Sequence, residues 1–198
     1  MHLFAQDRDR LLARLRRKIR KHFEVPAEVV EDIIHLHGYR IESSQYLPSS
    51  MLGCCHFDDK LVLIPESLAI RLRHPQSAPK VVRSVLAHEL GHIRLHARRA
   101  RAGEREAVWE DEADHYAQVF LVPWPQLMAR REVMLLTRSI WQCQRSLWNY
   151  VLRLANYFRV SGAFMVRALE RYELIDFCGK SRQISPRRSP IDDQAQAA

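Results

Sequence analysis

Apolar residues recur at helical spacing along most of the chain, and short apolar runs bounded by turn residues occur only between residues 39 and 65. A recurrence every three to four residues is typical of amphipathic helices, whereas short bounded runs indicate strands. The pattern therefore predicts a helix within residues 1–25, helices over 26–37, 80–99 and 104–122, and two short helices around Val160.

Three strands are predicted over residues 39–43, 51–57 and 60–64. The last two flank Asp58 and Asp59, which favour a tight turn and hence an antiparallel hairpin. A few strands followed by many helices predict an α+β fold. We expect a small antiparallel sheet accompanied by helices, followed by a small helical C-terminal domain.

Four segments are expected along the chain. They are a basic amphipathic N-terminal helix (1–25), a domain that contains the sheet (26–130), a helical domain (131–178) and a polar, disordered tail (179–198). The tail is expected to be disordered because it is polar and carries prolines at 186 and 190.

The composition favours a protein of the reducing cytoplasm. No apolar run approaches the roughly 20 residues that a membrane helix needs, and the N-terminus lacks the apolar core of a signal peptide. Cys143 and Cys178 are isolated in the sequence, and adjacent cysteines such as Cys54 and Cys55 do not pair easily. The run Cys54-Cys55-His56 lacks metal-site spacing and is interpreted as part of a strand.

The net charge of +8 is concentrated near the N-terminus, where residues 1–22 carry eight Lys/Arg and two Asp. Leucines and Ile19 fall at helical spacing among these charges. Such a helix can dock its apolar stripe on the body of the protein, or residues 8–21 can make a weak contact with nucleic acid.

The main chemical signal is His88-Glu-Leu-Gly-His92. On a helix, histidines four residues apart lie on one face, one turn apart, so both imidazoles can reach one zinc ion. Glu89 can then take a proton from the metal-bound water and pass it to a leaving amine. This short motif also arises by chance, and a catalytic zinc needs a third protein ligand.

Three residues are candidates for the third ligand. His96 lies about 12 Å along the helix from His88, too far to share an ion with it, and is interpreted as a packing or hydrogen-bonding residue. Glu110 lies on the next predicted helix, with Asp114 on the same face to hold a ligating histidine through its other nitrogen. Glu112 points about 200° away from Glu110. We therefore expect Glu110 to be the third ligand and Asp114 to support it.

The order of these motifs resembles the ImmA/IrrE family of zinc metallopeptidases, over about residues 28–176. The segment from Leu154 to Ile175 is similar to the helix-turn-helix-like pair that follows the family's zinc domain. The matching residues of the two metal motifs are His88, Glu89, Leu90, Gly91, His92, Leu95 and His96, then Glu110, Glu112, Ala113, Asp114, Ala117, Leu121 and Pro123.

The resemblance implies a gluzincin-like zinc endopeptidase (Zn²⁺ as cofactor) that cleaves helix-turn-helix transcriptional repressors. It also implies an edge strand over the cleft, which we place at residues 60–64. An exposed edge can bind an extended substrate by main-chain pairing. The alternative is a regulatory or DNA-binding protein that keeps the zinc domain without cleaving peptide bonds. The helix pair that motivates this alternative contains four arginines, but they are scattered along its sequence: Arg153, Arg159, Arg167 and Arg171.

Overall fold

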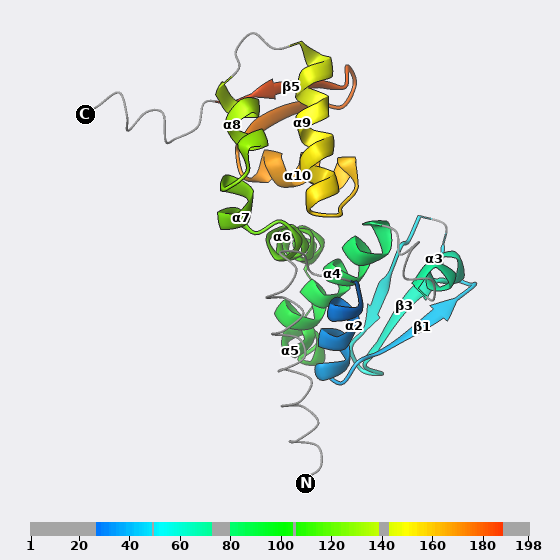
Figure 1. The fold of residues 1–198 in the computed structure, drawn as a ribbon. Coiled ribbons are helices and arrows are strands. Elements are labelled where there is room, and N and C mark those ends of the chain that lie inside the picture. Colours follow the sequence, from blue (N-terminus) through cyan, green and yellow to red (C-terminus); the bar gives the residue numbers. More distant parts are fainter. Residues whose placement is uncertain (1–26, 49, 73–79, 105, 139–142, 188–198) are drawn as a thin grey trace. The chain divides into compact units, whose positions relative to one another are not determined.

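The fold was analysed in a computed structural model, which describes residues 27–48, 50–72, 80–104, 106–138 and 143–187 (Figure 1). Helices predominate and two small sheets accompany them, so the expected α+β class is confirmed. The predicted basic helix of residues 1–25 lies outside the described residues. No helix in the described part of the chain is long and apolar enough to cross a membrane.

The first sheet has three strands, β1 (Arg40–Ser44), β2 (Cys54–His56) and β3 (Leu61–Pro65), in the order β1-β3-β2. The predicted hairpin is confirmed, because β2 pairs antiparallel with β3 across the turn at residues 57–60. β1, however, pairs parallel with β3, so the sheet is mixed and not antiparallel as expected.

The strand order also corrects the expected edge strand. β3 lies between the other two strands and cannot offer a free edge, whereas β2 has β3 on one side only. The error arose because the turn at Asp58 and Asp59 specifies the β2–β3 pairing, while no local signal specifies the parallel pairing of β1. Val62 and Ile64 of β3 are buried, as befits a central strand.

Five helices accompany this sheet (Figure 1). They are α2 (Ala27–Leu36), α3 (Glu66–Leu72), α4 (Lys80–Leu95), α5 (Ala97–Arg101) and α6 (Trp109–Leu121). α2 packs on α4, α3 lies against β1 and β3, and β2 contacts α4. α2 stops before Gly38, whose φ of +80° suits a glycine at a helix end. The short α3 was not expected, and α6 begins at Trp109, later than the predicted residue 104.

The chain divides into two compact units, residues 1–117 and 118–198, and the division falls inside α6. The sequence predicts a domain boundary at residue 130. The division into four segments stays a prediction. The second unit continues with α7 (Trp124–Met128), α8 (Arg131–Arg138), α9 (Gln144–Tyr157), α10 (Gly162–Arg171), β4 (Ile175–Cys178) and β5 (Gln183–Pro186).

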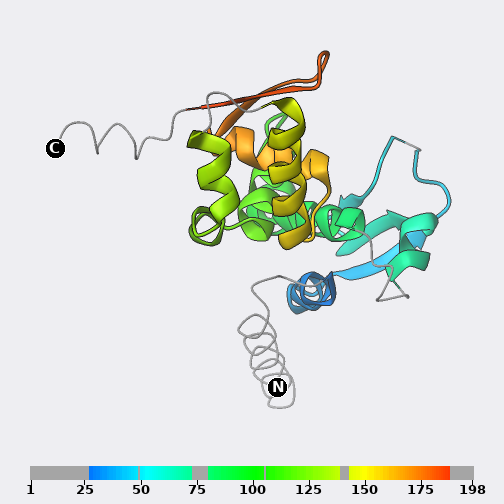
Figure 2. The ribbon, with the colours of Figure 1, turned by 45° about the horizontal axis from the view of Figure 1, so that its top comes forward.

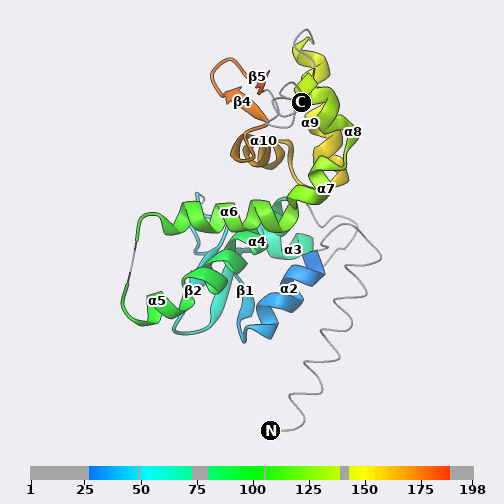
Figure 3. The ribbon, with the colours of Figure 1, turned by 90° about the vertical axis from the view of Figure 1, so that its left-hand side faces the viewer.

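The predicted helix pair around Val160 is present as α9 and α10. Ser161 caps α10 by accepting a hydrogen bond from the amide of Phe164 at 3.1 Å. Figures 2 and 3 show the hairpin of β4 and β5 beside α9 and α10. Gln144 of α9 secures this hairpin, accepting from the Ile184 amide and donating to its carbonyl at 2.8 and 2.9 Å.

The hairpin corrects the expectation of a disordered tail from residue 179. Residues 179–187 are ordered enough to form β5, which pairs antiparallel with β4. Ile184 is buried at 1% exposure, and its backbone is held by Gln144, which lies 40 residues away in the sequence. A four-residue strand with one buried apolar side chain is too short to show an alternating pattern in the sequence.

Candidate metal centre

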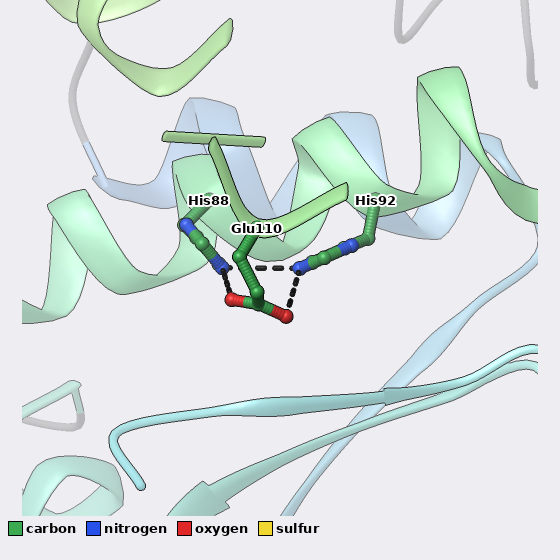
Figure 4. A group of neighbouring side chains, drawn as sticks. All are labelled: His88, His92 and Glu110. Carbon is green, nitrogen blue, oxygen red and sulfur yellow. Dashed lines mark hydrogen bonds and ion pairs between the residues drawn. The ribbon is translucent and has the colours of Figure 1, made fainter. Parts of the chain in front are cut away.

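The helix α4 places His88 and His92 one turn apart on the same face. Their Nε2 atoms lie 3.0 Å from each other, and their rings meet edge to face. This spacing follows directly from the helical rise, as the sequence predicted. The two side chains are largely removed from solvent, and their Nε2 atoms point to one place (Figure 4).

Glu110 joins the two histidines from the first turn of α6. Its Oε2 lies 3.2 Å from His88 Nε2 and its Oε1 lies 3.4 Å from His92 Nε2. Figure 4 shows the carboxylate beneath both rings, with the strands of the sheet running below it. Among the described residues these three form the group of side chains that could hold a metal ion.

The spacing of the three donors fits a zinc ion. Four ligands arranged tetrahedrally at 2.0–2.1 Å from zinc lie about 3.3 Å from one another. The two Nε2 atoms lie 3.0 Å apart, and two different oxygens of Glu110 lie 3.2 Å from that of His88 and 3.4 Å from that of His92. One donor atom from each of the three residues lies within 4.8 Å of the others. The nitrogen and oxygen donors are also those that zinc binds in catalytic sites. Their roles as ligands remain a prediction, which the donor geometry supports.

Gly91 lets α6 approach α4 closely enough to bring Glu110 to the histidines. A Cβ atom added to Gly91 would lie 3.0 Å from both the Cα and the carbonyl oxygen of Ala113, and 3.2 Å from Cβ of Tyr116. Backbone atoms cannot move aside as a flexible side chain can. The glycine between the two histidines therefore sets the distance between the helices.

Asp114 and Glu112 contact two different histidines, and at different ring nitrogens. Asp114 Oδ1 accepts a hydrogen bond from Nδ1 of His88 at 2.8 Å, which fixes the ring with Nε2 unprotonated. Glu112 Oε2 instead lies 2.9 Å from Nε2 of His96, in agreement with its predicted direction away from Glu110. His96 does not enter the donor group, but its Nδ1 lies 3.1 Å from Nδ1 of His92.

The two histidines differ in their affinity for protons. Burial lowers the pKa of His92 to about 4, and the neighbouring His88 and His96 add to this effect. Burial also acts to lower the pKa of His88, but the hydrogen bond to Asp114 and the nearby carboxylates outweigh it, so that pKa is raised. His92 is therefore neutral at physiological pH, as a metal ligand must be.

Glu89 has a buried carboxylate with few partners. It is 3% exposed, and among the described residues its Oε2 has no hydrogen-bond partner. Burial raises the pKa of Glu89 to about 7, against the opposing effect of His88. A carboxyl group that changes its charge near neutral pH suits a general base that later acts as an acid.

Gly53, next to strand β2, was not recognised in the sequence as part of this site. A Cβ atom added there would lie 2.4 Å from Oε1 of Glu89 and 2.9 Å from Cγ1 of Val85. The backbone leading into β2 therefore passes directly beside the Glu89 carboxylate. No local motif identifies Gly53, because the contact depends on the tertiary packing of β2 against α4.

These features define a protein with an HExxH helix whose two histidines meet a carboxylate from a second helix. The model of the Peptidase M78 family, described as the IrrE N-terminal-like domain, matches residues 67–170. The match spans just over half of the chain, and the chain belongs to this family. The resemblance seen in the sequence is thereby confirmed.

A solved structure shows the same fold. The chain is similar to a Mycobacterium tuberculosis transcriptional regulator, with a TM-score of 0.51 and 16% sequence identity. The alignment covers 82% of this chain and 49% of that one, so this chain spans about half the length of that structure. No curated protein sequence matches the chain.

The close approach at Gly91 predicts an effect on stability. Gly91→Ala is expected to lower the free energy of unfolding by about 1–2 kcal/mol, although alanine favours helices, because the methyl group meets the backbone of Ala113. Gly162→Ala is the matched control, since its Cβ would meet only the end of Leu152 at 3.4 Å. Urea denaturation of the metal-free protein measures both changes. Equal changes would show that the two helices do not pack closely at Gly91.

The buried carboxylate of Glu89 predicts a pH-dependent stability in the metal-free protein. Its pKa in the folded state, about 7, exceeds the ordinary value of 4.5 for a glutamate, so stability falls as pH rises between these values. Glu89→Gln removes this cost and is expected to stabilise the protein more at pH 8 than at pH 5, by up to about 3 kcal/mol. Denaturation with a chelator present measures the difference. The exposed Glu66→Gln is the control, and an identical shift at both pH values for Glu89→Gln would refute the argument.

Proposed function

We propose that the chain is a zinc-dependent endopeptidase in which His88, His92 and Glu110 hold the ion. The observation that carries this proposal is the convergence of two imidazole nitrogens and one carboxylate, with donor atoms within 4.8 Å of one another, beside the buried carboxylate of Glu89. A zinc ion held there would supply a Lewis acid that polarises the scissile carbonyl and makes water easier to deprotonate. Membership of a peptidase family supports the same reaction.

Glu89 is the proposed general base and then general acid. Its carboxylate takes the proton from the attacking water and delivers it to the nitrogen of the leaving amine. The burial that raises its pKa to about 7 favours this exchange, because both charge states are accessible at neutral pH. Asp114 holds His88 in the tautomer whose Nε2 is available to the metal.

The edge of β2 is the proposed substrate-binding element. It has a strand partner on one side only, and the chain leading into it passes beside Glu89 at Gly53. An extended peptide paired with this edge would pass the metal centre. We propose a helix-turn-helix transcriptional repressor as the substrate, cut within an extended segment. The family resemblance supports this choice.

Metal binding and cleavage test the proposal together. The wild-type protein is expected to bind one zinc per chain and to cleave a helix-turn-helix repressor encoded beside its gene. Glu89→Gln should retain zinc but lose at least about 100-fold in rate, because the proton carrier is removed. Glu110→Ala should weaken zinc binding and abolish cleavage, since the third ligand is lost.

Metal content is measured by mass spectrometry of the native protein, and cleavage by the masses of the repressor fragments. Asp111→Asn, which removes a charge next to Glu110, is the control and should keep both properties. Cleavage that survives in Glu89→Gln, or zinc stoichiometry that survives in a His88, His92 and Glu110 triple variant, would contradict the proposed site.

A second candidate function, duplex DNA binding by the C-terminal unit, is favoured by the distribution of charge. Residues 118–187 carry eleven Lys/Arg and four Asp/Glu, a net charge of +7. Residues 23–117, which hold the metal centre, carry eleven Lys/Arg and fifteen Asp/Glu, a net charge of −4. A basic excess of this size within residues 118–187 is the electrostatic footprint of a nucleic-acid-binding domain. The similar structure named a transcriptional regulator is consistent with this role.

The arginines that are scattered in the sequence partly gather in the fold. Arg167 and Arg171 lie one turn apart on the exposed face of α10, whose other face buries Phe164 and Met165. α10 is the second helix of the α9–α10 pair, which is the position of the recognition helix in helix-turn-helix proteins. The loop of the β4–β5 hairpin adds exposed Lys180 and Arg182.

DNA binding by this surface is tested with a labelled 30-base-pair duplex. The wild type is expected to bind in 50 mM salt, and a double variant of Arg167→Ala and Arg171→Ala should bind more weakly at every sequence tried. The slope of log affinity against log salt should fall by about 2, since two phosphate contacts are lost. Arg98→Ala, on exposed α5, is the control; an unchanged slope in the double variant would remove α10 from the DNA-binding surface.

A further inference from the structure

His96 is a fully buried histidine for which the proposed reaction has no use. Its side chain is 0% exposed, and it stands where α4 ends and α5 begins, with φ of −115° and ψ of −19°. It is too far along the helix to bind the same ion as His88. Both of its ring nitrogens nevertheless have polar partners, so it is more than a packing residue.

The hydrogen-bond partners of His96 fix the positions of the protons on the His92 and His96 rings. When Nε2 of His92 faces the metal centre unprotonated, Nδ1 of His92 carries the proton and donates it to Nδ1 of His96, at 3.1 Å. Nε2 of His96 must then carry a proton, which it donates to Oε2 of Glu112 at 2.9 Å. A single consistent arrangement of tautomers therefore connects His92 to a carboxylate of α6.

The helical geometry of α6 explains why His92 needs an intermediate residue. Asp114 lies one turn after Glu110 on the same face and reaches His88 directly. Glu112 points about 200° away from Glu110, so its carboxylate lies on the other side of the helix axis. His96, one turn beyond His92, bridges the distance that the Glu112 side chain does not cover.

An aromatic stack holds the ring of His96 in this orientation. The Trp109 indole lies parallel to it, with ring centroids 4.7 Å apart and an interplanar angle of 2°. Trp109 is 5% exposed, is contacted edge-on by Phe57, and has the guanidinium of Arg99 over its ring at 5.7 Å. Because Trp109 is itself held in place, the stack leaves the imidazole of His96 little freedom to rotate. Both hydrogen bonds of His96 are therefore preformed.

We propose that His96 and Glu112 form a positioning relay that fixes the tautomer and orientation of His92 for metal binding. Asp114 does the same for His88 through one hydrogen bond, while the relay uses two. This inference rests on the proposed zinc site, because it concerns how one of its ligands is held. His96 and Glu112 are positioning residues that touch neither the ion nor the substrate.

The relay is tested by the affinity for zinc, which does not depend on catalysis. His96→Leu removes the acceptor for His92 and is expected to weaken zinc binding about 10- to 100-fold. His96→Asn returns an oxygen near the position of Nδ1 and should recover most of the affinity, although it fills the cavity less completely. A residue that only packs would give the opposite order, because leucine preserves more of the buried apolar contact than asparagine.

Glu112→Gln tests the far end of the relay without disturbing the core, since the Glu112 side chain is 46% exposed. It removes the charge behind His96 and is expected to weaken zinc binding about tenfold. Asp111→Asn removes the same charge from the preceding, exposed position of α6 and is the matched control. Titration against a chromophoric chelator measures the affinities, and the visible spectrum of the Co²⁺-substituted protein reports a change in ligand orientation.

The outcomes separate the relay from the zinc site itself. If the wild type binds no zinc, the proposed function fails and the relay fails with it. If the wild type binds zinc and Glu112→Gln matches Asp111→Asn in both affinity and Co²⁺ spectrum, the relay is overturned while the zinc site stands. If His96→Leu does not fold, the comparison of Glu112→Gln with Asp111→Asn still decides.

Discussion

The close packing of α4 against α6 is the constraint on which the candidate site depends. Neither helix holds a metal site alone: α4 contributes two imidazoles and α6 contributes carboxylates. They meet because Gly91 has no side chain where the backbone of Ala113 lies, 3.0 Å from the position of a Cβ. The glycine within the HExxH motif thus sets an interhelical distance, and the distances of 3.2 and 3.4 Å between the Glu110 oxygens and the two histidines depend on it.

The same packing produces the electrostatic character of the site. Glu89 is buried under Gly53 and beside His88, so its charged form lacks solvation and its pKa rises to about 7. His92 is buried among other imidazoles, so its pKa falls to about 4. One carboxyl and one imidazole are therefore shifted in opposite directions by burial, and each shift favours the form that a metal-assisted hydrolysis requires.

The helical period was sufficient to put Glu110 and Asp114 on one face of their helix and Glu112 on another. That the first face meets the histidines depends on the packing of α4 against α6 at Gly91. The sequence also located the β2–β3 hairpin and the α9–α10 pair, which have strong local turn and capping signals. It failed where pairing is non-local. The parallel alignment of β1 with β3, the strand β5 held by Gln144, and the approach of Gly53 to Glu89 each join residues without a shared local pattern.

The relation between the two helices explains why two carboxylates contact histidines in different ways. Histidines at 88, 92 and 96 advance by one turn each, so they form a row along α4 and its end. On α6, Glu110 and Asp114 share a face that meets the first part of this row, while Glu112 lies on another face and meets its end. Glu112 does not face the candidate metal centre, but it is still connected to His92 through His96, the histidine farthest from that centre. The first turn of α6 thus supplies Glu110 to the candidate metal centre and Glu112 to the histidine behind it. Asp114, one turn after Glu110, holds His88. The acidic sequence of α6 is therefore explained by the geometry of the neighbouring helix.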